Sequence, residues 1–127
     1  MGNGACYIIL VVDDHHDNRE LLNVFLQGLG YGVVEASNGL EALKVAGTNT
    51  PDLIIMDLSM PVMDGFNAVR ILRQMPTTRK VPVVACTAQD DPTYKVQALN
   101  VGFNAILTKP IDFTRLRGVL TQYLKAA

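Results

Sequence analysis

The sequence has little cysteine, little net charge and no long apolar run, and each shortage excludes a class of protein. The two cysteines have no scaffold-like spacing, so we interpret both as reduced thiols of a cytosolic protein. A net charge of −1 and a pI of about 6.0 provide no basic surface for wrapping DNA or binding an anionic membrane. No apolar run approaches the roughly 18 residues that span a bilayer, and residues 1–5 are too short and uncharged for a signal peptide.

The chain does have enough apolar residues for one sizeable core. Hydrophobic residues make up 49% of the 127 residues, which suits one domain of the commonest size. We find no internal repeat, low-complexity tract or linker, so 1–127 is expected to be a single domain with a core from about 7 to 124. Continuous apolar runs of about four to eight residues indicate strands buried on both faces. The expected strands cover 7–12, 33–36, 53–56, 81–86 and 105–108, and all but the short second one are such runs.

Segments with helical spacing lie between these expected strands. Leu22, Phe25 and Leu26 form part of an apolar stripe with spacings of three and four residues, as on one face of a helix. Capping residues predict where the later helices begin, and glycines predict where helices end. The expected caps are Asn38, Asp64, Asp91 and Asp112, and the expected stops are Gly30, Gly47 and Gly102.

Five repeats of a strand followed by a helix predict an α/β fold. Because parallel strands need right-handed crossovers, we expect a doubly wound five-stranded parallel sheet, flavodoxin-like, with five helices distributed over both faces. The strand order follows from the polar residues at the strand ends. They can meet only if the first, third, fourth and fifth strands are neighbours, which favours the order 2-1-3-4-5.

Polar side chains stand where four of the apolar runs stop. Asp13 and Asp14 follow the first run, Asp57 the third, Thr87 the fourth and Lys109 the fifth. In a parallel sheet, ligands and chemistry gather outside the carboxyl ends of the strands. We therefore expect three carboxylates, one hydroxyl and one ammonium to converge on one small site, an arrangement that packing alone does not explain.

The clustered carboxylates need a positive partner. Two unit charges about 4 Å apart repel by roughly 4 kcal/mol at an effective dielectric of 20, so protons, a lysine or a divalent cation must offset the repulsion. A hard cation such as Mg²⁺ suits carboxylates and phosphate oxygens. Lys109 supplies a mobile charge and Thr87 a hydroxyl donor. Together these are the parts needed for phosphoryl transfer to an aspartate.

Five short motifs occur in order along the chain, each at the end of an expected strand or directly after one. They are Val11-Val12-Asp13-Asp14, Met56-Asp57, Met60-Pro61-Val62-Met63-Asp64-Gly65, Thr87-Ala88 and Lys109-Pro110. Each alone is weak, but in this order they resemble the receiver domain of two-component response regulators. The resemblance covers the chain from Tyr7 to about Leu124.

The resemblance implies a role for each acidic residue of the site. Asp57 would be the phosphoacceptor, taking phosphoryl from a histidine of a sensor histidine kinase or a histidine phosphotransfer protein. Asp14 would ligate Mg²⁺ directly and Asp13 through water, and the backbone carbonyl of Ser59 would complete the protein ligands beside Asp57. The implied protein is a signalling switch that catalyses only its own phosphorylation and dephosphorylation, and is therefore not an enzyme with an external substrate.

The resemblance also implies how the phosphoryl group would be sensed. Thr87 would hydrogen-bond the group and shift toward it, and Lys109 would pair with it or, before it arrives, with Asp57. The Lys109–Pro110 bond is expected to be cis. The output partner is unknown and would bind the face built from the fourth helix, the fifth strand and the fifth helix. We expect a cytoplasmic protein that contacts neither nucleic acid nor membrane directly.

Two features depart from the commonest family pattern. Ile106 stands where many members carry an aromatic switch residue, so coupling from Thr87 must use other packing. The fifth helix has Arg115 and Gly118 where the winged-helix transcription-factor subfamily has Glu and Arg, which argues against that subfamily's activation dimer.

The initiating methionine favours a complete single-domain regulator over a receiver cut from a hybrid kinase or larger regulator.

Other interpretations fit parts of the pattern. A Mg²⁺-dependent phosphohydrolase with an aspartyl-phosphate intermediate would need an acid two residues after its nucleophile, where this chain has Ser59. A flavodoxin-like flavin binder would need a phosphate loop rich in hydroxyls and glycine, and the loop here is acidic. A non-phosphorylated scaffold of the same fold would lack the acceptor or the lysine.

Some single residues of the site also have simpler interpretations. Asp14 could simply cap a helix. His15 and His16 make a poor zinc set and are interpreted as exposed first-turn or loop residues.

Overall fold

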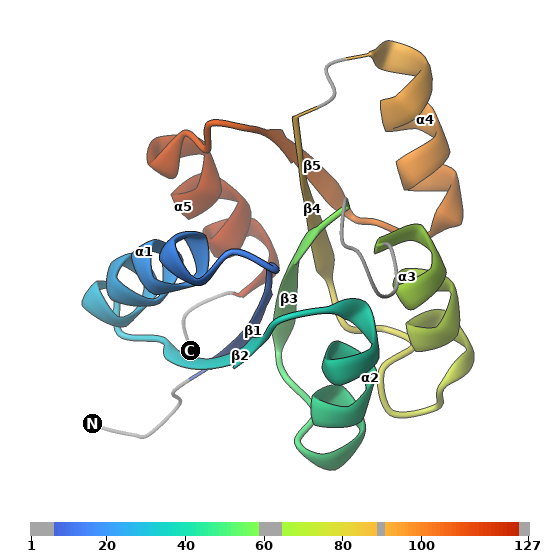
Figure 1. The fold of residues 1–127 in the computed structure, drawn as a ribbon, viewed down its shortest axis with the longest axis horizontal. Coiled ribbons are helices and arrows are strands. Elements are labelled where there is room, and N and C mark those ends of the chain that lie inside the picture. The colour runs from blue at the N-terminus through green and yellow to red at the C-terminus, as the bar shows by residue number, and fades with distance from the viewer. Residues whose placement is uncertain (1–6, 59–64, 89–90, 125–127) are drawn as a thin grey trace.

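A computed structural model describes residues 7–58, 65–88 and 91–124. Strands and helices alternate along these segments, as the sequence predicts (Figure 1). In chain order they are β1 (Ile8–Val12), α1 (His16–Gly28), β2 (Gly32–Ala36), α2 (Gly39–Thr48), β3 (Leu53–Asp57), α3 (Gly65–Gln74), β4 (Val83–Thr87), α4 (Pro92–Val101), β5 (Ala105–Thr108) and α5 (Phe113–Tyr123). None of the described helices is long and apolar enough to cross a bilayer.

The strands form one parallel sheet in the order β2-β1-β3-β4-β5, which confirms the predicted order. The pairing aligns the carboxyl ends of neighbouring strands. Val12 pairs with Met56, and Asp57 pairs with Cys86. The last residue of β4 pairs with the last residue of β5. The ends of β1, β3, β4 and β5 therefore lie along one edge of the sheet.

Helices cover both faces of the sheet, with α1 and α5 on one face and α2, α3 and α4 on the other (Figure 1). Successive strand residues point to opposite faces. Ile9 and Val11 of β1 join the cluster under α1 and α5, while Leu10 and Val12 join the cluster under the other three helices. Burial on both sides explains why the strands are continuously apolar rather than alternating.

Local side-chain caps begin three of the helices where the sequence predicts them. Asn38 accepts a hydrogen bond from the Glu41 N–H at 2.8 Å, and Asp91 and Asp112 make equivalent caps at α4 and α5. The Glu41 carboxylate reaches back to the Ser37 N–H at 2.6 Å, one residue before the cap. Gly102 ends α4 with a φ of 134°, a conformation that favours glycine. The expected cap Asp64 lies outside the described residues.

Three boundaries of β3 and β4 differ from the sequence expectation, and the two strand ends matter for function. β4 begins at Val83 rather than at Val81, because Pro82 has no N–H to donate to the ladder. β3 and β4 each run one residue further than the apolar pattern indicates, so that Asp57 and Thr87 are the last residues of their strands. These two polar side chains are thus positioned by sheet pairing and not by a loop.

Candidate functional site

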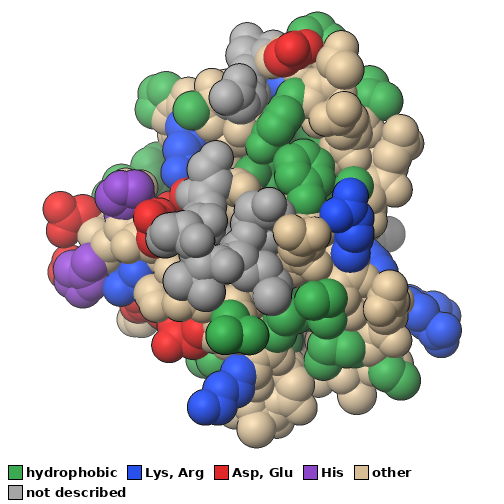
Figure 2. All heavy atoms as spheres, turned by 45° about the vertical axis from the view of Figure 1, so that its right-hand side comes forward, with side chains coloured by type: hydrophobic (Ala, Val, Ile, Leu, Met, Phe, Trp, Pro, Cys, Tyr) green, Lys and Arg blue, Asp and Glu red, His purple; other side chains and the backbone are tan. Residues whose placement is uncertain are grey.

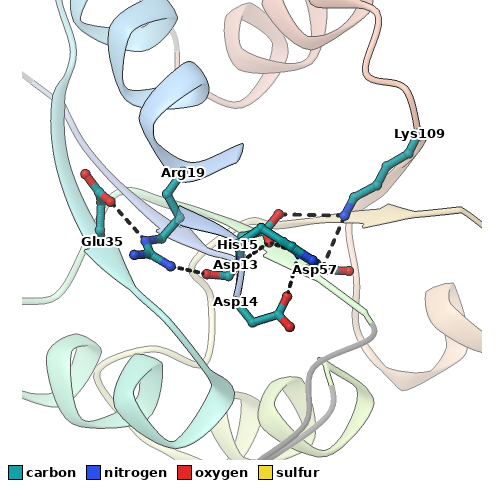
Figure 3. Close-up of polar contacts among 7 residues, drawn as sticks. All are labelled: Asp13, Asp14, His15, Arg19, Glu35, Asp57 and Lys109. Atoms are coloured by element: carbon teal, nitrogen blue, oxygen red, sulfur yellow. Dashed lines mark hydrogen bonds and ion pairs between the residues drawn. The ribbon is translucent and has the colours of Figure 1, made fainter. Parts of the chain in front are cut away.

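Two buried aspartates and one lysine form the centre of the site (Figure 3). Asp57 ends β3 and is 5% exposed, and Asp13 follows β1 and is 4% exposed. The Lys109 Nζ lies 3.2 Å from Asp57 Oδ2 and 3.6 Å from Asp13 Oδ2. Asp13 and Asp57 are 44 residues apart in the chain. The Lys109 ammonium, which comes from the segment after β5, contacts both carboxylates.

The charges of this cluster hold one another in place. Burial alone would lower the pKa of Lys109, but the carboxylates of Asp57 and Asp13 outweigh burial and the pKa is raised. The lysine is therefore fully charged at neutral pH. A single ammonium serving two carboxylates, with Asp14 beside them, leaves the cluster negatively charged and still attractive to a cation.

Asp13 is held by three hydrogen bonds. Its N–H donates to the Ala36 carbonyl at 3.1 Å, its Oδ1 accepts from the His15 N–H at 2.9 Å, and its own carbonyl accepts from Arg19 Nη1 at 2.8 Å. Arg19 is in turn oriented by Glu35, whose Oε1 lies 3.1 Å from the guanidinium Nε. Arg19 and Glu35 thus fix the backbone that carries the acidic pair.

Sequence reasoning missed Arg19 and Glu35. The one available signal is the charge of Glu35 inside an otherwise apolar strand, β2, which suggests a partner across the edge of the sheet. No spacing rule connects that glutamate to an arginine 16 residues before it in a different element. Their pairing depends on how α1 lies against β2.

Asp14 and His15 lie on the outer side of the cluster. Asp14 does not cap α1, since the N-cap residue is His15 and no side chain bonds there. The His15 Nδ1 lies 3.0 Å from Asp14 Oδ1 and 3.4 Å from Asp13 Oδ1. The ring is exposed, as the sequence indicates, but it also contacts the acids, which the sequence does not indicate. Figure 2 shows both histidines beside acidic side chains on this face.

The residues present fit a divalent cation. Asp13, Asp14, His15 and Asp57 each offer one ligand atom, and these atoms all lie within 4.8 Å of one another. An octahedral ion with bonds of about 2.1 Å places opposite ligands about 4.2 Å apart, so the cluster needs only small adjustments. Three carboxylates suit a hard ion such as Mg²⁺. The predicted carbonyl ligand of Ser59 lies outside the described residues.

The fourth and fifth strands supply Thr87 and Lys109. Thr87 is 2% exposed at the end of β4, and its carbonyl accepts a hydrogen bond from the Lys109 N–H at 2.7 Å. The Lys109–Pro110 peptide bond is cis, which confirms the sequence expectation. Burial raises the pKa of the neighbouring Cys86 thiol to about 12, so that this cysteine stays protonated and unreactive.

The first residue of α3 packs closely on the end of β3. A Cβ atom on Gly65 would lie 2.9 Å from the Asp57 carbonyl oxygen and 2.9 Å from Leu58 Cδ2. These distances are too short for any other residue without a shift of the backbone. Gly65 therefore lets α3 begin directly against the residue that carries the buried carboxylate.

Comparison with known proteins identifies the family. The model of the response regulator receiver domain matches residues 9–121. The chain belongs to this family. As a receiver domain it is a phosphoryl-accepting switch of two-component signalling with an acidic Mg²⁺ site at Asp13, Asp14 and Asp57, and not an enzyme with an external substrate. The family match removes the support for the phosphohydrolase and flavin-binding alternatives.

Three relatives illustrate the likeness. The chain is 44% identical over 115 residues to the response regulator PleD of Caulobacter vibrioides, covering 87% of this chain but only 25% of PleD. This receiver domain thus spans about a quarter of the length of that relative. One similar solved structure is the receiver domain of the sensor histidine kinase PA1611 of Pseudomonas aeruginosa, with a magnesium ion in its active site cleft. It is 32% identical to this chain with a TM-score of 0.87, and the match covers 96% of this chain and 100% of that one.

Another is the receiver domain of Ssk1 from Saccharomyces cerevisiae, solved in complex with the histidine phosphotransfer protein Ypd1. It is 30% identical with a TM-score of 0.85, and the match covers 93% of this chain and 88% of that one.

Proposed function

We propose that Asp57 is the residue that accepts the phosphoryl group. The observation that supports this most is the burial of Asp57 at the end of β3 with its Oδ2 held 3.2 Å from the Lys109 ammonium, inside the cation cluster. A carboxylate oxygen of Asp57 attacks the phosphorus of a donor phosphohistidine. The new P–O bond forms as the P–N bond breaks, and the imidazole leaves with the electron pair and takes a proton from solvent.

The acidic residues around Asp57 would hold the metal ion. Asp14 and Asp57 would be direct protein ligands together with the Ser59 carbonyl, and Asp13 would act through water. When bound, Mg²⁺ supplies positive charge to the oxygens of the transferring phosphoryl group. Arg19 and Glu35 hold the Asp13 backbone in position, so the ligands are arranged before the ion arrives.

Lys109 and Thr87 would respond to the new anion. An aspartyl phosphate adds roughly −1.5 to −2 charges, if it resembles other phosphoresidues. The Lys109 ammonium, which is now shared between Asp57 and Asp13, would turn to the phosphoryl oxygens, and the Thr87 hydroxyl would donate to them. Because Lys109 N–H also bonds the Thr87 carbonyl, the two residues would move together.

We propose that the phosphodonor is a histidine kinase or a histidine phosphotransfer protein that covers a cleft beside the site. This cleft of about 510 Å³ begins at the site itself, and most of its surface is apolar. It is lined by Asp13, Asn18, Leu21, Leu22, Lys109, Pro110, Ile111 and Phe113. Leu21 of α1 is 57% exposed at its rim. The complex of the Ssk1 receiver domain with Ypd1 supports a donor of this class.

Part of the output surface would lie on α4, which covers the opposite face of the sheet from the cleft. Val96 and Leu99 of α4 are large apolar residues that are more than half exposed, and α4 borders β5. We propose that the face of α4, β5 and α5 binds an output protein, and that direct contact with nucleic acid is not part of its role. The two thiols, of which Cys86 is free and buried, are consistent with the cytoplasmic location that we propose.

The proposal is tested with acetyl phosphate as a small donor in the presence of Mg²⁺. Intact mass spectrometry in acid is expected to show one added phosphoryl group on the wild-type protein and none on Asp57→Asn. The matched control is Asp52→Asn, an aspartate at the opposite end of β3, which should be phosphorylated normally. Equal phosphorylation of Asp57→Asn and wild type would show that another residue is the acceptor.

A further inference from the structure

We infer that His15 is a nitrogen ligand of the metal site, and that it shifts the preference of this site from Mg²⁺ toward borderline ions such as Co²⁺, Ni²⁺ and Zn²⁺. The inference rests on the proposed function for the position of the metal site. It goes beyond that function by assigning a further ligand and a different class of ion. The sequence gives no reason to expect it, because the two adjacent histidines make a poor zinc set on their own.

The position of the His15 ring supports coordination. An octahedral ion with bonds of about 2.1 Å places neighbouring ligands about 3.0 Å apart. The His15 Nδ1 lies 3.0 Å from Asp14 Oδ1 and 3.4 Å from Asp13 Oδ1. The nitrogen is thus placed as a neighbouring ligand to Asp14, with Asp13 close enough to bond a metal-bound water, and Asp57 offers an atom within 4.8 Å of the same group (Figure 3).

The backbone of His15 is anchored at the site. Its N–H donates to Asp13 Oδ1 at 2.9 Å, and its carbonyl accepts from the Arg19 N–H at 3.1 Å in the first turn of α1. These hydrogen bonds hold the backbone of His15 beside the carboxylates, although 68% of its side chain is exposed. Exposure on one side leaves an entry path for the ion.

The chemistry of imidazole sets the expected selectivity. Mg²⁺ binds oxygen ligands almost exclusively, so a histidine adds little to its affinity. Imidazole suits Zn²⁺, Ni²⁺ and other first-row ions, whose affinities follow the Irving–Williams order. An all-oxygen site already shows part of that order. What His15 adds is a larger ratio of Ni²⁺ affinity to Mg²⁺ affinity than the carboxylates alone would give.

The neighbouring histidine provides a matched control. His16 is exposed to a similar extent, at 73%, but its Nε2 lies 3.5 Å from Glu20 Oε2 on the outside of α1. It takes no part in the cluster that contains Asp13, Asp14 and Asp57. Replacing His16 therefore removes one surface imidazole and leaves the metal site intact.

The test compares wild type, His15→Ala and His16→Ala by calorimetric titration with MgCl₂ and with NiCl₂. Because metal affinity depends on pH, all titrations use one buffer at one pH. We expect the ratio of Ni²⁺ to Mg²⁺ affinity to fall about tenfold or more in His15→Ala and to stay unchanged in His16→Ala. Pulsed electron paramagnetic resonance of bound Mn²⁺ should show a ¹⁴N coupling that only His15→Ala loses.

The outcomes separate this inference from the proposed function. If wild type binds Mg²⁺ but Mn²⁺ shows no ¹⁴N coupling, or if His15→Ala leaves the affinity ratio unchanged, His15 only hydrogen-bonds Asp14 and the inference is wrong. If wild type binds neither ion, the proposed metal site itself is wrong. Circular dichroism of both variants checks that loss of binding does not come from loss of the fold.

Discussion

Lys109 neutralises two of the carboxylates that a metal ion would also neutralise. Its ammonium lies 3.2 Å and 3.6 Å from oxygens of Asp57 and Asp13. Because the pKa of Lys109 is raised in the folded protein, its contribution to stability is fully present below the ordinary pKa of lysine. That contribution is lost only as the pH rises through the raised value. At neutral pH, the lysine and the metal ion therefore compete for the same negative charge.

We predict that Lys109→Ala binds Mg²⁺ at least about fivefold more tightly than wild type. The reason is that a positive charge close to the ligands repels the ion by about 1 kcal/mol or more at such distances. Calorimetric titration measures the change. Lys80→Ala removes an equivalent charge from the segment before β4, at the opposite edge of the sheet, and should leave the affinity unchanged. Weaker binding by Lys109→Ala would contradict the competition.

The individual residues of the site differ in how far the sequence reveals them. Asp13, Asp57 and Lys109 could be predicted because the strand pattern places each of them at a carboxyl end of the sheet. The contacts of His15 with the acids, and of Arg19 with the Asp13 carbonyl, could not. They depend on the rotation of α1 about its axis and on side-chain rotamers, which no spacing rule specifies.

At the scale of single elements, the start of α3 determines how β3 presents Asp57. We predict that Gly65→Ala lowers the free energy of unfolding by about 1–3 kcal/mol, because its Cβ would overlap the Asp57 carbonyl and Leu58. Urea denaturation measures the loss, and phosphorylation by acetyl phosphate should slow as Asp57 is displaced.

A second glycine serves as the control for that substitution. Gly118 lies inside α5, is exposed, and has nothing within 4 Å of its would-be Cβ among the described residues. Gly118→Ala should therefore raise the free energy of unfolding by up to about 1 kcal/mol, since alanine favours the helix. If Gly65→Ala were as stable as wild type, the close packing of α3 on β3 would not hold Asp57 in place.

Arg73 joins the end of α3 to two other segments of the chain. Its guanidinium donates to the carbonyls of Val81 at 2.7 Å and of Gly102 at 2.8 Å, and to the Asn104 side chain at 2.8 Å. Burial lowers the pKa of Arg73, yet an arginine stays charged at neutral pH. The residue thus fastens α3 to the segments that precede β4 and β5.

We predict that Arg73→Met destabilises the protein by about 2–3 kcal/mol, because charge-assisted hydrogen bonds are lost and partly buried carbonyls are left unsatisfied. Arg70→Met is the matched variant, since Arg70 bonds only Asn67 on the surface of the same helix among the described contacts, at 3.0 Å. Its effect should stay within about 0.5 kcal/mol. Thermal or urea unfolding that ranks the two variants equally would refute the role of Arg73.

The elements themselves were largely predictable from caps, stops and apolar runs. Asn38, Asp91 and Asp112 cap helices as expected. The exceptions are the start of β4 at Val83, the ends of β3 and β4, where Asp57 and Thr87 extend the strands, and Gly47, which lies inside α2 and does not end it. From the sequence alone, a polar residue after an apolar run is interpreted as the first residue of a loop. In the structure, backbone pairing with the neighbouring strand determines where the strand ends.

At the scale of the whole molecule, the site and the proposed donor surface form one continuous region. The apolar cleft includes Asp13 and Lys109 of the site and continues to the exposed Leu21 on α1. A protein donor that covers this cleft would reach Asp57 and exclude water from it. A small donor such as acetyl phosphate needs no such surface.

We predict that Leu21→Arg slows phosphotransfer from a phosphorylated histidine phosphotransfer protein about tenfold or more, since replacing an apolar contact residue of an interface by a charge costs about 1–2 kcal/mol. Phosphorylation by acetyl phosphate should be slowed far less. The control is Leu40→Arg on α2, where the leucine is equally exposed at 57% but lies outside the cleft. Equal slowing by both variants with the protein donor would place the docking surface elsewhere.

The overall architecture could be predicted because the residues of the functional site restrict which strands can be neighbours in the sheet. The polar residues at four strand ends can meet only if β1, β3, β4 and β5 are neighbours, which favours the order β2-β1-β3-β4-β5 that is found. The cleft beside α1 could not be predicted, because its lining comes from α1 and from the segment after β5. That proximity arises only when both pack on the same face of the sheet.

The central claim is that Asp57 carries the phosphoryl group, and chemical trapping tests it most directly. Borohydride reduces an aspartyl phosphate to homoserine, and peptide mapping by mass spectrometry then locates the modified residue. After reaction with a phosphodonor and Mg²⁺, we predict homoserine at position 57 and at no other aspartate. Homoserine at Asp13 or Asp14, or phosphate retained on His15 or His16, would contradict the account.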